Sequence, residues 1–83
     1  MTSLQILGGV IFIRDDEDSD KWYEVFRAEH NCKNYRLKID RTTPIPYYEL
    51  YRDWRENKRN FADRLYASGS LDKIDEWIKQ NLL

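Results

Sequence analysis

Residues 47–66 read YYELYRDWRENKRNFADRLY, and this stretch decides which fold the sequence predicts. Projected at about 100° per residue, its apolar side chains fall on one stripe. The stripe consists of Tyr47, Leu50, Tyr51, Trp54, Phe61 and Leu65. Because this pattern is typical of an amphipathic helix docked on a core, we expect one long helix that begins near Pro46 and ends before Gly69.

A second, shorter helix is expected at the C-terminus. Ser70 can cap its first turn, and Asp72 lies where an acidic side chain favours a helix start. The apolar face of this helix consists of Leu71, Ile74, Trp77, Ile78 and Leu82.

The first half of the chain has the character of β-strands. Residues 4–13, LQILGGVIFI, form either one strand with a glycine bulge, which we favour, or two short strands joined by a tight turn at Gly8-Gly9. Residues 10–13 are apolar on both faces, which suggests a well-covered strand. Residues 22–29 form the next strand. Residues 35–41 alternate, and we expect their core-facing side chains to be Tyr35, Leu37 and Ile39.

The predicted fold is therefore α+β. It is a small antiparallel β-meander of three strands, or four if Gly8-Gly9 is a turn, followed by two C-terminal α-helices packed on one face. We expect residues 1–83 to form a single domain. The lone cysteine, Cys32, excludes an internal disulfide and favours a reducing compartment. No stretch approaches the roughly 20 apolar residues of a membrane helix, so we expect a cytoplasmic protein that does not bind a membrane.

Charge is unevenly distributed along the chain, although the net charge is only −1. Residues 1–20 carry one arginine and five acidic residues, whereas residues 21–45 carry six basic and three acidic residues. On the predicted long helix, Arg52, Arg55 and Arg59 form a basic ridge that Tyr66 extends. Arg36 and Lys38, on the polar face of the third strand, add to this basic surface.

The acidic loop at residues 15–20, DDEDSD, resembles the start of a calcium-binding loop, with Asp16, Asp18 and Asp20 at the first three ligand positions. The spacing then fails, because Lys21 stands where glycine is needed and Arg27 stands where a bidentate glutamate is needed. We therefore expect a solvated loop that contacts a partner, and no metal site.

No set of residues predicts catalysis or a cofactor. His30 and Cys32 are the only residues of their types and lie two apart in a turn, without a third group to orient the histidine. They are also too few for a structural zinc site, which usually has four ligands. On the predicted long helix, Lys58 interrupts the apolar stripe, and we expect its methylenes to cover aromatic rings. The acidic residues opposite the stripe indicate surface ion pairs: Glu49, Asp53, Glu56 and Asp63.

We therefore expect a non-enzymatic adaptor, regulator or inhibitor that binds another protein through charged and aromatic surfaces. The alternative is a nucleic-acid-binding module that uses its basic face. That face would comprise Arg36, Lys38, Arg52, Arg55 and Arg59. Either function is compatible with a homodimer, formed through the third strand as an exposed edge or through a partly uncovered aromatic stripe.

Overall fold

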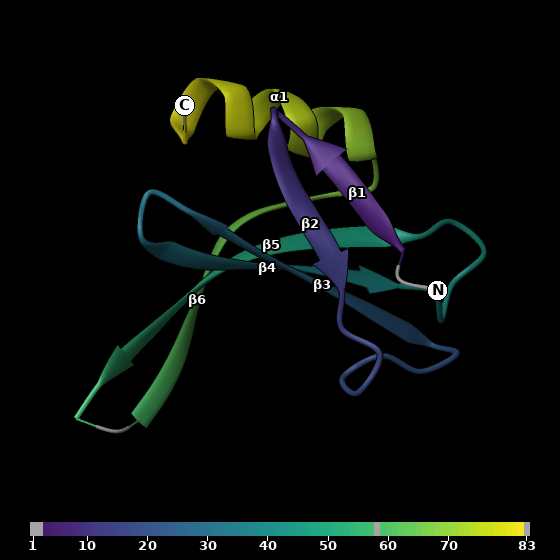
Figure 1. The fold of residues 1–83 in the computed structure, drawn as a ribbon. Helices are drawn as coiled ribbons and strands as arrows, with labels where there is room; N and C mark the ends of the chain where they lie inside the picture. The colour runs from purple at the N-terminus through teal and green to yellow at the C-terminus, as the bar shows by residue number, and fades with distance from the viewer. Residues whose placement is uncertain (1–2, 58, 83) are drawn as a thin grey trace.

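The structure is a computed structural model that describes residues 3–57 and 59–82. It consists of an antiparallel meander of six strands followed by one helix, with the strands in the spatial order β1-β2-β3-β4-β5-β6 (Figure 1). The elements are β1 (Leu4–Leu7), β2 (Val10–Arg14), β3 (Tyr23–His30), β4 (Lys33–Asp40), β5 (Tyr47–Glu56), β6 (Arg59–Ser68) and α1 (Leu71–Asn81).

Residues 47–57 and 59–66 belong to a β-hairpin, so the predicted long helix is wrong. β5 and β6 pair from Tyr48, opposite Ser68, to Glu56, opposite Arg59. Asn57 follows β5 with a left-handed φ of 47°, as expected of a tight turn. The predicted architecture of three or four strands with two helices is therefore corrected to six strands with one helix.

Aromatic side chains on both faces of β5 explain why its strand pattern resembles a helix. Tyr48, Leu50 and Trp54 lie on one face of the strand, and Tyr47 and Tyr51 lie on the other. Tyrosine and tryptophan favour strands, and this preference outweighs the helical spacing. The missed signal is the polar break at residues 57–58. Lys58 lies outside the described residues, and so does the contact predicted for its side chain.

Gly8 and Gly9 form a turn rather than a bulge, so the single long strand is also wrong and the two-strand alternative is right. Their φ angles are 59° and 84°, which fit the type I′ turn that joins two-residue hairpins. The two strands that follow, β3 and β4, confirm the rest of the expected meander. The side chains expected to face the core are indeed buried: Tyr35, Leu37 and Ile39.

The C-terminal helix is confirmed as α1, with Ser70 at the N-cap position and Asp72 in the first turn. The Ser70 side chain makes no capping hydrogen bond. Ile74 and Ile78 are fully buried. The other predicted apolar residues of the helix pack against the same core: Leu71, Trp77 and Leu82.

The core lies between α1 and one face of the strongly curved sheet, and α1 contacts β1, β5 and β6 (Figure 1). The turn of the first hairpin is docked on the helix, because the Gly8 N–H donates a hydrogen bond to Asp75 Oδ1 over 2.6 Å. The helix therefore joins the first hairpin to the last one. The buried strand residues of this core are Leu7, Val10, Phe12, Phe26, Ala28, Tyr35, Leu37, Ile39 and Leu50.

We predict that Gly8→Ala lowers the free energy of unfolding by about 2 kcal/mol or more. The added Cβ would strain the left-handed backbone at this position and would also overpack the contact between the turn and α1. A Cβ at Gly8 would lie 2.5 Å from Ile78 Cγ2. Gly69→Ala is the matched control, since nothing lies within 4 Å of a Cβ there. Urea unfolding of both variants checks this prediction, and equal midpoints would contradict the close approach of the turn to α1.

A substitution in the turn between β3 and β4 should stabilise the protein. Asn31 and Cys32 have left-handed φ angles of 51° and 62°, and Asn-Gly is the preferred sequence for such a turn. Cys32→Gly should relieve strain at the second position and raise the free energy of unfolding by about 0.5–1 kcal/mol. A lower urea midpoint for this variant would show that the turn has a different conformation.

Candidate functional site

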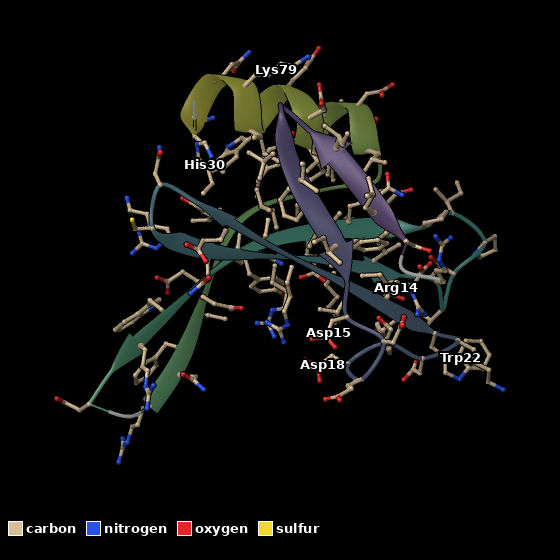
Figure 2. All side chains as sticks on the ribbon, in the orientation of Figure 1. Arg14, Asp15, Asp18, Trp22, His30 and Lys79 are labelled. Carbon is tan, nitrogen blue, oxygen red and sulfur yellow. The ribbon has the colours of Figure 1, made fainter. Side chains whose placement is uncertain are left out.

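The face of the sheet that points away from α1 contains a groove of about 1200 Å³. Ile11 and Ile13 of β2 line one side of the groove. Trp54 of β5 and Phe61 of β6 line the opposite side, and residues of β3 and β4 lie between the two sides. In Figure 2, Asp15 and Asp18 lie on this side of the molecule, with α1 and Lys79 on the other. The groove is the candidate functional site.

One wall of the groove is an arm formed by the far end of the β5–β6 hairpin, residues 52–57 and 59–64, which projects from the rest of the sheet (Figure 1). Residues 59–64 are all exposed. Trp54 and Phe61 are cross-strand partners, and their rings stack with centroids 4.6 Å apart. Such a pair stiffens a two-stranded ribbon, and both residues belong to the lining of the groove.

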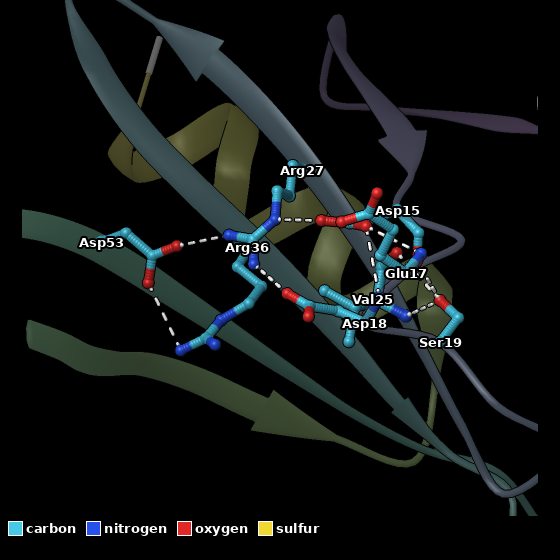
Figure 3. A network of polar contacts seen from close by, with 8 residues as sticks. All are labelled: Asp15, Glu17, Asp18, Ser19, Val25, Arg27, Arg36 and Asp53. Carbon is cyan, nitrogen blue, oxygen red and sulfur yellow. Dashed lines mark hydrogen bonds and ion pairs between the residues drawn. The ribbon is translucent and has the colours of Figure 1, made fainter. Parts of the chain in front are cut away.

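The floor of the groove is a chain of alternating arginines and aspartates (Figure 3). Arg27 Nε lies 2.7 Å from Asp15 Oδ2, its Nη1 lies 3.0 Å from Asp53 Oδ2, and its Nη2 pairs with Asp18. Arg36 Nη2 lies 3.3 Å from Asp53 Oδ1. Arg27 and Arg36 are direct cross-strand partners that would repel one another, and the Asp53 carboxylate between them offsets that repulsion.

The same network fixes the acidic loop on β3. The pKa of Asp15 is lowered by the hydrogen bond from Arg27 and by backbone N–H donors at Asp18 and Glu17. The pKa of Arg27 is raised by its hydrogen bonds to Asp15 and Asp18. Both groups are therefore charged at neutral pH, and the start of the loop is held beside the groove.

The three aspartates with calcium-loop spacing do not converge on one point. Asp16 pairs with Arg14, and Asp18 pairs with Arg27. Asp20 instead accepts hydrogen bonds from the backbone N–H groups that follow it, and these bonds lower its pKa. Across residues 3–57 and 59–82, no group of three or more histidine, cysteine or acidic side chains is placed to hold a metal ion.

The basic ridge predicted for a helix does not exist, because strand geometry separates its members. Arg52 lies opposite Asp63 on one face of the hairpin, whereas Arg55 lies on the other face. Arg59 is opposite Glu56, near the tip of the arm and several residues from Arg52 along the ribbon. The structure therefore does not bring these three arginines together into one surface.

The other predicted contact residues have local partners. Arg36 lines the groove, with its guanidinium 5.1 Å from the Tyr51 ring centroid. Lys38 Nζ lies 4.6 Å from the Tyr23 ring centroid. Tyr66 is half-buried and stacks on Trp77 of α1, with centroids 5.8 Å apart, so its ring helps to hold the helix on the sheet.

The exposed apolar residues of the first hairpin are the part of the site that the sequence did not reveal. Ile11 and Ile13 alternate with the buried Val10 and Phe12 and are about half exposed, so the expectation of a well-covered strand is wrong. The only signal in the sequence is the run of apolar residues itself. That run indicates two apolar faces without telling which of them is covered.

His30 and Cys32 have different surroundings. His30 Nε2 lies 3.2 Å from the carbonyl oxygen of Leu82, so the imidazole contacts the end of α1 (Figure 2). The thiol of Cys32 is exposed in the β3–β4 turn.

Comparison of the chain with models of protein families, with curated proteins and with solved structures finds no match. Within the part of the chain that the structure describes, no helix is long and apolar enough to cross a membrane.

We predict that Asp15→Asn lowers the free energy of unfolding at pH 7. Because the pKa of Asp15 is lowered in the folded protein, its ionised form stabilises the fold above its unfolded pKa of about 3.9. This stability is lost as the pH falls through the folded-state pKa, so wild type and variant should converge in acid.

Urea unfolding between pH 7 and pH 2 measures this difference. Glu17→Gln is the control, because it removes the same charge from the same loop. Among the described residues, the Glu17 side chain takes part in no ion pair. A difference between wild type and Asp15→Asn that does not change with pH would contradict the role of the ionised carboxylate.

Proposed function

We propose that this protein is a non-enzymatic binding module, an adaptor, regulator or inhibitor, that holds a segment of another protein in the groove. The observation that supports this proposal is the combination of exposed apolar walls with a floor whose charges neutralise one another. Protein interfaces have this character, with apolar and aromatic contacts at the centre and paired polar groups around them.

The apolar walls would supply most of the affinity. Ile11 and Ile13 are 54% and 49% exposed, and Phe61 is 40% exposed. Burying such side chains against a partner stabilises a complex through the hydrophobic effect, and stacked aromatic rings lose little conformational entropy on binding. A partner segment should therefore carry apolar side chains spaced to contact both walls.

Charges at the rim of the groove would set the orientation of the partner. Asp16 and Glu17 are exposed at the end of the groove nearest the acidic loop. The loop thus favours a lysine or arginine next to the apolar part of the partner segment. Such charge complementarity determines the association rate and the choice of partner more than it determines affinity.

Nucleic acid is the second candidate, because residues 52–64 carry five basic and three acidic residues and include the Trp54–Phe61 stack. A basic ribbon with one exposed aromatic ring, that of Phe61, offers contacts to a phosphate backbone and to unstacked bases. The charges that line the groove argue against nucleic acid as its ligand. Its lining contains four arginines and five acidic residues, and Arg14, Arg27 and Arg36 are already paired with carboxylates. Protein is therefore the favoured partner.

We propose that the protein binds its partner in the cytoplasm. The exposed thiol of Cys32 stays free most readily in a reducing compartment. An oxidising compartment would favour disulfide-linked pairs of chains through this residue.

The experiment is affinity capture from native lysate with the tagged protein, with and without nuclease. The test variant is Ile11→Ser with Ile13→Ser, which removes one apolar wall. The double variant should capture at least about tenfold less of a partner that binds wild type specifically. The reason is that each aliphatic side chain buried against the partner contributes about 1.5–3 kcal/mol to binding.

Ile45→Ser is the matched control, since Ile45 is 74% exposed but does not line the groove. It makes the same chemical change away from the site and should leave capture unchanged. Equal loss of the partner in both variants, or no loss in either, would contradict the groove as the binding site. Recovery that consists of nucleic acid and disappears with nuclease and with added salt would establish the second candidate instead.

A further inference from the structure

The free edge of β1 presents a defined set of backbone groups. β1 and β2 form a two-residue hairpin in which Leu7 pairs with Val10 and Gln5 pairs with Phe12. In such a ladder, every second residue bonds to its partner, and the Arg14 N–H to Ser3 carbonyl bond fixes which ones do. The backbone N–H and C=O groups of Leu4 and Ile6 therefore point outward from the edge.

The same two residues carry an exposed aliphatic patch. Leu4 lies opposite Ile13, and Ile6 lies opposite Ile11. All four side chains are between 49% and 62% exposed, on the face that carries the groove. Because Ile11 and Ile13 also line the groove, one apolar surface runs from the groove to the free edge of the sheet.

The two edges of the sheet differ in charge. β6, at the other edge, carries Arg59, Asp63 and Arg64 in its exposed half, and charged side chains hinder the addition of another strand. β1 reads LQIL and carries no charge. The β1 edge is thus open to strand addition, and two copies of it do not repel one another.

We propose that a second copy of this chain pairs with β1, so that two β1 strands lie antiparallel about a two-fold axis at Gln5. In this register Leu4 pairs with Ile6 of the second copy, and Ile6 pairs with its Leu4. All the outward backbone groups of these residues are then bonded, in two hydrogen-bonded pairs on either side of Gln5. The register is self-complementary, as a two-fold interface requires.

Pairing also enlarges the apolar surface beyond what one copy offers. A standard protein interface buries about 800 Å² on each partner, whereas even one large aromatic side chain buries only about 150–250 Å². Four half-exposed aliphatic side chains therefore fall short of such an interface. Two paired copies present eight of these side chains on one continuous face, which extends from one groove to the other. This inference rests on the proposed function, because it concerns the same apolar surface.

The test is sedimentation velocity of the full chain over a range of concentrations. The variants are Gln5→Lys and Gln5→Glu, which place two like charges at close range on the two-fold axis. Each variant alone should self-associate at least about tenfold more weakly than wild type, because like charges facing each other in an interface are costly. An equal mixture of the two should restore dimers, and this rescue also shows that both variants are folded.

Gln80→Lys and Gln80→Glu are the matched controls, since Gln80 is exposed on α1 and does not belong to β1. These variants should dimerise like wild type. Wild type that stays monomeric at every concentration would overturn the proposal, as would dimers that persist in both Gln5 variants. Loss of dimers in the Gln80 variants would overturn it too, because the contact would then involve α1. If the chain is monomeric but Ile11→Ser with Ile13→Ser still loses its partner, the dimer fails and the proposed function stands.

Discussion

The burial of Ile74 and Ile78 between the two ends of the meander is the interaction on which the rest of the structure depends. A meander of six strands has two edges far apart in sequence, and α1 contacts strands at both of them. Gly8 allows the first turn to approach the helix closely enough for its N–H to bond to Asp75. With α1 on one face of the sheet, the groove lies on the other face.

Strand alternation determines which side chains lie on the face that carries the groove. Residues next to buried positions point into the groove, so Ile11, Ile13 and Arg27 line it as a direct consequence of the core behind them. The arginines do not create a basic surface, because Asp15 and Asp53 neutralise them in place. An apolar groove with paired charges suits a polypeptide better than a polyanion.

The sequence predicts an element correctly where its apolar residues follow a single spacing. The prediction fails where the same residues fit both the spacing of a strand and the spacing of a helix. β4 and α1 are predictable because apolar residues fall on one face only, at Tyr35, Leu37 and Ile39 and again at Ile74 and Ile78. β5 carries aromatic residues on both faces, which imitates a helix. The groove is less predictable still, since Arg27 and Asp53 lie 26 residues apart and meet only after three strands have paired.

The most direct test of protein binding in the groove is photo-crosslinking in native lysate, with a photoreactive aromatic residue in place of Phe61 or, separately, of Ile45. Phe61 lines the groove and Ile45 is exposed outside it. The proposed function predicts a discrete adduct with another protein from position 61 and none from position 45. An adduct with a protein from position 45 only, or with nucleic acid only from position 61, would contradict it.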